Sequence, residues 1–369
     1  MFLNQFTDIT ASRSESFARF TLEKRFPDII DKIIANNSFD RSINSRLELF
    51  KKEQYVKEFP IVDGHTSWET FFDRYGNQHW HTTPFFVLEV YIYNKILWLT
   101  DYYINKIDPF LWIKSSDLQN NLSLFDRFLS TYSSYTTPEI ITFSLQGNIA
   151  DLSQLVRSEG ANHTTISNDI EKCISHFEKH DLYQVDIILD NSGVELFGDL
   201  ILAHHIIEKK LAQRVVLHFK KVPFIVSDAT LQDLSMLLNA LKRFPSLHKA
   251  INRHMEDGHI ILKDELFWTS PTHFFTEGFS AIMEPSDMII SKGDANYRRF
   301  FGDKEVPVTE RLDSLLGYLT TPTLLLRVCK SEIISNIPKE VILRLDYEDP
   351  KWKSNGKYGV IQFYNPPFG

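Results

Sequence analysis

From about residue 135 onward, short apolar and β-branched runs alternate with segments of helix length. We expect strands at 183–189, 214–219, 223–227, 288–291, 323–328 and 358–363. A segment of helical periodicity, 195–212, directly follows the first run. Such alternation is typical of βα units on a doubly wound, largely parallel sheet, and it predicts an α/β fold.

Before about residue 134 the apolar residues recur at helical spacing, as in Leu88, Ile92, Ile96 and Leu99. A chain of 369 residues also exceeds one ordinary core. We therefore predict an all-helical N-terminal subdomain, residues 1–134, and an α/β domain, residues 135–369. The polar stretch 158–168 is expected to be a loop between them.

Charge and composition limit the partners. The net charge of −8 and a pI of about 5.9 argue against nucleic acid. The two cysteines, Cys173 and Cys329, lack CxxC spacing, which favours a reducing, cytoplasmic setting. The most apolar stretch, 85–99, is interrupted by Glu89 and Lys95, so no membrane span is expected.

Polar side chains stand where expected strands end. Asp190 and Asn191 follow the run 183–189, Asp228 follows 223–227, and Lys292 follows 288–291. In doubly wound sheets ligands bind at the carboxyl edge, so these four side chains are expected to share one crevice. Carboxylate and amide oxygens suit a hard divalent cation, and a lysine balances phosphate charge. The pattern predicts metal-dependent hydrolysis of a phosphomonoester.

Each of these residues also has an ordinary structural explanation. An Asp-Asn pair after a strand is common in turns and N-caps. Asp228 would equally cap a helix over 230–244. Lys292, before Gly293, would equally be a solvated loop lysine.

Two ordered motifs add a family resemblance. The segments 190–195 (DNSGVE) and 292–299 (KGDANYRR), with Asp228 between them, resemble signatures of the metal-dependent damage-control phosphatases. The closer similarity is to a branch once described as acidic-residue methyltransferases. Further matching elements are Trp80, Pro84, Phe85, Glu89, Tyr91, Tyr93, Gly147, Asn148, 151–153, Leu326, Arg327, Lys330 and 356–360.

The resemblance implies a three-layer α/β/α domain with a helical N-terminal subdomain. It implies hydrolysis of small phosphorylated metabolites, with sugar phosphates such as fructose 1-phosphate and fructose 6-phosphate as the class. The implied ion is Mn²⁺, Co²⁺, Ni²⁺ or Mg²⁺, with Mn²⁺ preferred, and the implied ligands are Asp190, Asn191 and Asp228. Lys292 matches the lysine that contacts phosphate. The sequence departs from the branch at Asn94, Gln146, Ala295 and Val328.

Secondary candidates for substrate binding have alternatives of their own. Asp151 is also a possible helix cap, and Glu89 a possible member of a buried ion pair. Asp294 serves either as a general acid or base or to stabilise a turn. Glu195 either complements a helix dipole or orients a metal-bound water. The remaining substrate-binding candidates are Asn148, Asn296 and Arg327.

The thirteen histidines lack HExxH spacing. The pair His204 and His205 is therefore expected among core or surface residues rather than as zinc ligands.

Three rival functions remain at this point. Asp190 as a phosphorylated nucleophile would call for a second Asp two positions on, where Ser192 stands. An S-adenosylmethionine-dependent carboxyl methyltransferase would be expected to carry a glycine-rich turn after its first strand, and none is found. A non-catalytic sugar-phosphate-binding protein would share the same pocket.

Overall fold

A seven-stranded sheet forms the centre of the computed structural model, which describes residues 2–60, 67–146 and 164–367. The strand order is β1-β7-β6-β5-β2-β3-β4. β2, β3, β4, β5 and β6 are mutually parallel, whereas β7 runs antiparallel to β6. The strands are β1 Thr164–Asn168, β2 Leu182–Ile188, β3 Ala212–Lys220, β4 Ile260–Glu265, β5 Met288–Lys292, β6 Thr323–Val328 and β7 Tyr358–Tyr364.

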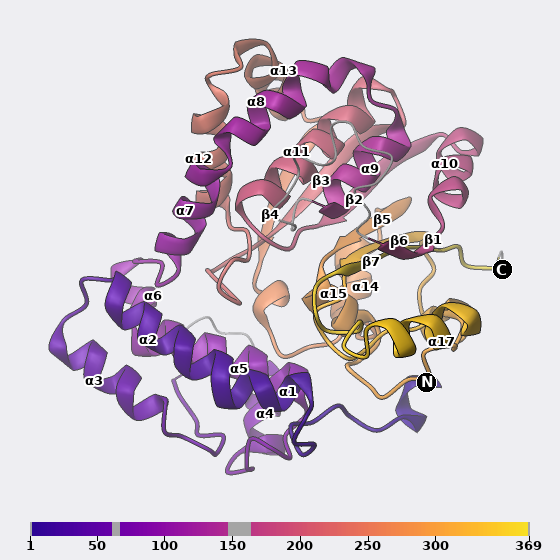
Figure 1. The fold of residues 1–369 in the computed structure, drawn as a ribbon. Helices are drawn as coiled ribbons and strands as arrows, with labels where there is room; N and C mark the ends of the chain where they lie inside the picture. Colours follow the sequence, from indigo (N-terminus) through magenta and orange to yellow (C-terminus); the bar gives the residue numbers. More distant parts are fainter. Residues whose placement is uncertain (1, 61–66, 147–163, 368–369) are drawn as a thin grey trace.

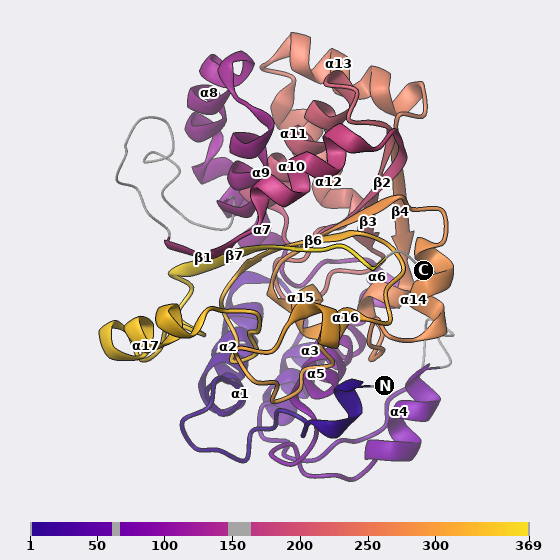
Figure 2. The same ribbon diagram turned by 90° about the vertical axis from the view of Figure 1, so that its right-hand side faces the viewer.

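Helices cover both faces of this sheet, which gives three layers (Figures 1 and 2). One layer holds α7 Leu111–Asn120, α8 Leu122–Thr131, α9 Thr137–Gln146, α10 Ile170–Lys179, α11 Gly193–Glu208, α12 Leu231–Leu241 and α13 Pro245–Glu256. The other layer holds α14 Glu277–Met283, α15 Asp294–Phe300, α16 Leu312–Leu316 and α17 Lys339–Glu348. The N-terminal helices lie against this second layer: α1 Phe17–Phe20, η2 Thr21–Arg25, α2 Phe26–Asn36, α3 Arg41–Phe50, α4 Ser67–Tyr75, α5 Phe85–Leu99 and α6 Tyr102–Asn105. The predicted α/β class with a helical N-terminal region is confirmed.

Strand residues alternate between two hydrophobic clusters, one on each face of the sheet. On β6, Leu324 and Leu326 belong to the cluster with α11, and Leu325 belongs to the cluster with α5. On β2, Ile187 and Ile188 divide in the same way. Because successive side chains of a strand point to opposite faces, a strand covered on both sides is apolar throughout.

The helical N-terminal region divides between these clusters. Side chains of α2, α3, α4 and α5 belong to the cluster that contains Leu325. Leu118 and Phe125, on α7 and α8, belong instead to the cluster of α11. The helices thus pass from one face of the sheet to the other between α6 and α7. The predicted domain boundary at residue 134 stays a prediction.

Three details of the predicted strands and loops differ from the structure. The run 223–227 is a turn, because Ile225 and Val226 adopt φ angles of 37° and 65°. β1 and β4 were not expected, and β1 occupies the end of the predicted loop 158–168. The helix after β2 ends at Glu208, and β3 begins at Ala212.

Candidate functional site

Two chain segments lie side by side at the carboxyl edge of the sheet. The first follows β2, and the second follows the turn at 223–227. The amide of Ser192 donates to the carbonyl of Ser227 (2.7 Å), and the amide of Ala229 donates to the carbonyl of Asp190 (2.8 Å). This pairing places Asp228 directly across from Asn191. Asp228 therefore lies beside Asn191 as expected, although it follows a turn and not the strand that the sequence predicted.

The Asn191 amide connects the carboxylates of this edge. Its Nδ2 donates to Asp190 Oδ2 and to Glu195 Oε2, both at 2.8 Å. Its Oδ1 accepts a hydrogen bond from Ser227 Oγ at 2.5 Å. Glu195 reaches this point because α11 begins at Gly193, immediately after the strand end. One amide thus holds two acidic side chains together in a buried setting.

Burial makes both Asp190 and Asp228 reluctant to ionise. The pKa of Asp190 is raised well above its ordinary value by burial and then by the Glu195 and Asp228 carboxylates. Burial raises the pKa of Asp228 to about 6, although Lys220 opposes the rise. The ammonium of Lys220 lies 3.6 Å from Asp228 Oδ2, an atom without a hydrogen-bond partner among the described residues. A divalent cation would satisfy this oxygen and offset the repulsion, so the donor set fits the predicted metal.

Lys292, at the end of β5, points into the same acidic cluster. Its Nζ lies 2.8 Å from Asp199 Oδ1 and 3.5 Å from Glu195 Oε1. It also donates to the carbonyl and the hydroxyl of Ser144, on α9. Although burial lowers the pKa of Lys292, Asp199 and Glu195 outweigh that effect and raise it, so the group stays charged. The lysine is fully buried and is not a solvated loop residue.

The caps of the neighbouring helices do not use the proposed ligands. α12 is capped by Thr230, whose hydroxyl and backbone form a capping box with Asp233. Asp228 is therefore free of the capping role that the sequence left open. At the start of α11, the amide of Val194 donates to Asp117 Oδ2 (3.2 Å), from α7.

The secondary candidates are occupied by protein partners. Glu89 forms a buried ion pair with Arg298, and Asp294 accepts from Arg327 Nε at 2.8 Å. Burial raises the pKa of Asp294, but Arg327 and Arg298 outweigh it and lower the pKa below its ordinary value. Asn296 Nδ2 donates to two backbone carbonyls. Asn148 and Asp151 lie outside the described residues.

Two cations near the site were not singled out as site residues from the sequence. Lys330 lowers the pKa of Asp190 through its charge, and its ammonium forms no ion pair with the described residues. Arg25, at the end of η2, has a pKa raised chiefly by Tyr93 and also by Glu89 and Asp294. Lys330 was visible only as part of a matching motif. No sequence pattern around Arg25 pointed to it, because it belongs to the N-terminal helices and does not follow a strand.

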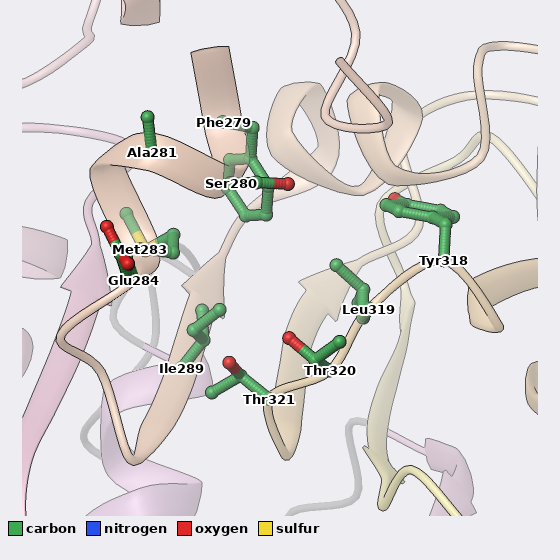
Figure 3. A pocket seen from close by; sticks show the side chains of 10 residues that line it. All are labelled: Phe279, Ser280, Ala281, Met283, Glu284, Ile289, Tyr318, Leu319, Thr320 and Thr321. Atoms are coloured by element: carbon green, nitrogen blue, oxygen red, sulfur yellow. The ribbon is translucent and has the colours of Figure 1, made fainter. Parts of the chain in front are cut away.

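A cavity of about 370 Å³ lies away from these residues, beside the beginning of β5 and the residues that precede β6 (Figure 3). Its described lining contains the carboxylate of Glu284 and neither lysine nor arginine. Because a phosphate would find no cationic partner there, this cavity is not the predicted site.

Elsewhere in the described chain, His204, Glu208 and His254 satisfy the spacing of a metal site. The described residues contain no helix long and apolar enough to cross a bilayer.

Comparisons with known proteins agree on one family. A model described as the damage-control phosphatase ARMT1-like domain matches residues 21–343. Damage-control phosphatase ARMT1 of Bos taurus is 30% identical over 260 residues, which cover 62% of this chain and 58% of that protein. The Danio rerio protein of the same name is 36% identical over 194 residues, covering 50% and 43%. The Homo sapiens protein is 26% identical over 434 aligned positions, covering 95% and 97%.

A solved structure shares the fold. The crystal structure of a DUF89 family protein from Pyrococcus horikoshii has a TM-score of 0.53 at 15% identity and covers 94% of this chain and 96% of its own. The family model spans most of the sequence. The alignments with the cattle and zebrafish proteins cover about half of those proteins' own length. The chain belongs to the damage-control phosphatase ARMT1-like domain family.

Proposed function

We propose that the chain is a metal-dependent phosphatase that hydrolyses small phosphorylated metabolites at the carboxyl edge of the sheet. The observation that carries the proposal is the buried group of Asp190, Glu195 and Asp228, held together around Asn191. The raised pKa values of Asp190 and Asp228 favour a site that gains stability by taking a cation, and so does Asp228 Oδ2, which accepts no hydrogen bond from the described residues.

Asp190, Asn191 and Asp228 are the proposed ligands, and Mn²⁺ is the proposed ion, with Co²⁺, Ni²⁺ or Mg²⁺ as alternatives. When bound, the ion supplies polarisation of a phosphoryl oxygen and orientation of the attacking water. Asn191 fixes the Asp190 and Glu195 carboxylates relative to each other. Glu195 is the proposed acceptor for the proton of that water, because Asn191 holds its Oε2 beside the Asp190 carboxylate and makes no hydrogen bond to its Oε1.

The phosphate is proposed to meet a cationic side of the site. Lys330 and Arg25 form no direct ion pair with the described residues. Lys330 acts on Asp190 through its charge, and Arg25 interacts electrostatically with Tyr93, Glu89 and Asp294. Lys292 is fully engaged with Asp199 and Ser144. We therefore assign Lys292 to charge balance beneath the phosphate and Lys330 to direct contact.

The substrate class is proposed to be sugar phosphates, such as fructose 1-phosphate or fructose 6-phosphate. Glu89, Asp294 and Tyr93 interact electrostatically with Arg25, so donors and acceptors for a polyhydroxyl group gather around it, with one oxygen of each carboxylate already held by Arg298 or Arg327. Asn148, Asp151, Asn296 and Arg327 remain in the proposed substrate-binding set, and the geometry of the first two lies outside the described residues.

The test is phosphate release from a panel of sugar phosphates and p-nitrophenyl phosphate, with and without Mn²⁺. We expect turnover by the intact chain to require metal and to be abolished by Asp190→Ala. Asp257→Ala, an exposed carboxylate on the helical layer, is the matched control. Full turnover by Asp190→Ala would remove the basis of the proposal.

The same preparation separates the rival functions. Trapping of a phosphorylated Asp190 would favour covalent catalysis over attack by water. Binding of S-adenosylmethionine without phosphatase activity would favour the methyltransferase. Binding of sugar phosphates with no phosphate release across the panel would favour a sensor.

A further inference from the structure

Two neighbouring helices bring three metal-binding side chains together. His204 and Glu208 are four residues apart on α11 and so lie on one face, and His254 approaches them from α13. One potential ligand atom from each side chain lies within 4.8 Å of the other two. α11 and α13 pack in the same layer (Figures 1 and 2). The cluster therefore joins two helices that are far apart in sequence.

The contacts within this cluster are incomplete. His254 Nε2 and Glu208 Oε1 are 3.0 Å apart. His204 is 6% exposed, and its Nδ1 has no hydrogen-bond partner among the described residues. A buried ring nitrogen without a partner is unfavourable, and a ligand of some kind is one way to satisfy the ring. Glu208, with 53% of its side chain exposed, leaves the cluster open to solvent.

Neighbouring histidines are engaged elsewhere. His205 Nε2 lies 3.0 Å from Thr137 Oγ1, and His259 Nδ1 lies 3.0 Å from the carbonyl of Gln213. The ligands available to a metal ion are therefore His204, Glu208 and His254, and a water molecule would complete a tetrahedral arrangement. The position of Glu208 at the end of α11 also favours a cation, since a helix carboxyl end carries partial negative charge.

We propose that His204, Glu208 and His254 form a metal site for a borderline divalent ion such as Zn²⁺, separate from the carboxylate site at the sheet edge. Two imidazole nitrogens and one carboxylate suit Zn²⁺, whereas an all-oxygen set suits Mn²⁺ or Mg²⁺. At about 1.5 Å per residue, His204 lies roughly 16 Å along α11 from Gly193. The site therefore cross-links α11 to α13 and takes no part in the reaction.

The experiment uses the full chain carrying Asp190→Asn, stripped of metal with a chelator, so that the first site is weakened. Zn²⁺ is titrated by calorimetry, thermal unfolding is followed, and Co²⁺ is used as a spectroscopic substitute. The test variants are Glu208→Gln and His254→Gln. Glu256→Gln and His248→Gln, which change the same residue types on α13, are the matched controls.

We expect the parent and both controls to bind one Zn²⁺ per chain at this site and to melt at a higher temperature with zinc. Both test variants should bind Zn²⁺ at least tenfold more weakly and lose the shift in melting temperature. Glu208 is exposed, so the Glu208→Gln variant should fold normally. Equal zinc affinity in the parent and both test variants, or no binding by the folded parent at micromolar zinc, would overturn the proposal. Zinc affinity is measured without turnover, so failure of the proposed phosphatase function would not affect this result.

Discussion

The backbone of Gly293 lies directly against the Asp190 carboxylate. A Cβ at position 293 would come within 1.9 Å of Asp190 Oδ2, and Gly293 has a φ of 84°. Only glycine combines this conformation with so close an approach. The turn after β5 therefore fixes the position of an acidic side chain that follows β2.

Gly293→Ala is expected to displace Asp190 and to abolish metal-dependent phosphate release. Gly258→Ala is the matched control, because Gly258 has a φ of 76° but a Cβ there would meet no atom within 4 Å. Both variants should lose roughly 1 kcal/mol or more of unfolding free energy from backbone strain. Only Gly293→Ala should lose activity in the folded protein. Equal activity of the two folded variants would contradict the proposed position of Asp190.

Asp228→Asn should stabilise the metal-free protein at neutral pH while reducing turnover. The folded pKa of Asp228 is raised to about 6 from an ordinary value of 3.8, chiefly by burial. A carboxyl with a raised pKa contributes stability below pH 4 that is lost as the pH rises through 6. The asparagine does not titrate, so its advantage should grow over this window to roughly 3 kcal/mol at most.

Denaturant unfolding of the metal-free parent and Asp228→Asn at pH 4, 5, 6 and 7 checks this expectation. Added Mn²⁺ should narrow the difference at pH 7, because the metal stabilises only the parent's ionised ligand. Asp264→Asn, on β4, serves as the control, and added Mn²⁺ should not change its stability difference from the parent. A stability difference that does not change with pH would contradict the account.

Lys292→Met should destabilise the protein by roughly 3–5 kcal/mol, because it leaves the buried Asp199 without its cation. Adding Asp199→Asn should restore most of that stability. We expect the double variant to fold and yet to have at least tenfold lower kcat/KM, since Lys292 also faces Glu195. Lys95→Met, which breaks the distant ion pair with Glu53, should lower stability without lowering kcat. Wild-type turnover in the folded double variant would assign Lys292 a purely structural role.

Much of the fold was predictable because parallel strands covered on both faces are apolar throughout. β4 was not predicted as a strand because it lies at the sheet edge and carries Lys263 and Asp264 within its six residues. The run 223–227 is as apolar as a strand, but two β-branched residues there adopt left-handed φ angles. Such a conformation is held by tertiary contacts, including the bond from Ser227 to Asn191, and local pattern does not reveal it.

The expectation that ligands gather where strands end placed Asp190, Asn191, Asp228 and Lys292 together, although Asp228 follows a turn and not the expected strand. It did not reveal which partner each side chain takes, because Asp199 reaches Lys292 from the second turn of α11, on its inward face. The cluster of His204, Glu208 and His254 escaped for a related reason. Its third member stands on another helix, and from the sequence His204 was considered only with His205.

Lys330→Gln should raise KM for the best sugar phosphate by about tenfold or more while leaving kcat and the melting temperature close to those of the parent. Its ammonium forms no direct ion pair with the described residues, so its removal breaks no salt bridge, although Asp190 loses one nearby positive charge. A cation that contacts phosphate equally in the bound substrate and the transition state contributes uniform binding, which appears in KM alone. Inhibition by inorganic phosphate should weaken in parallel, whereas Lys339→Gln, on the exposed start of α17, should change neither constant. If Lys330→Gln instead lowers kcat with KM unchanged, the lysine acts on the transition state, and the division of labour between Lys330 and Lys292 is reversed.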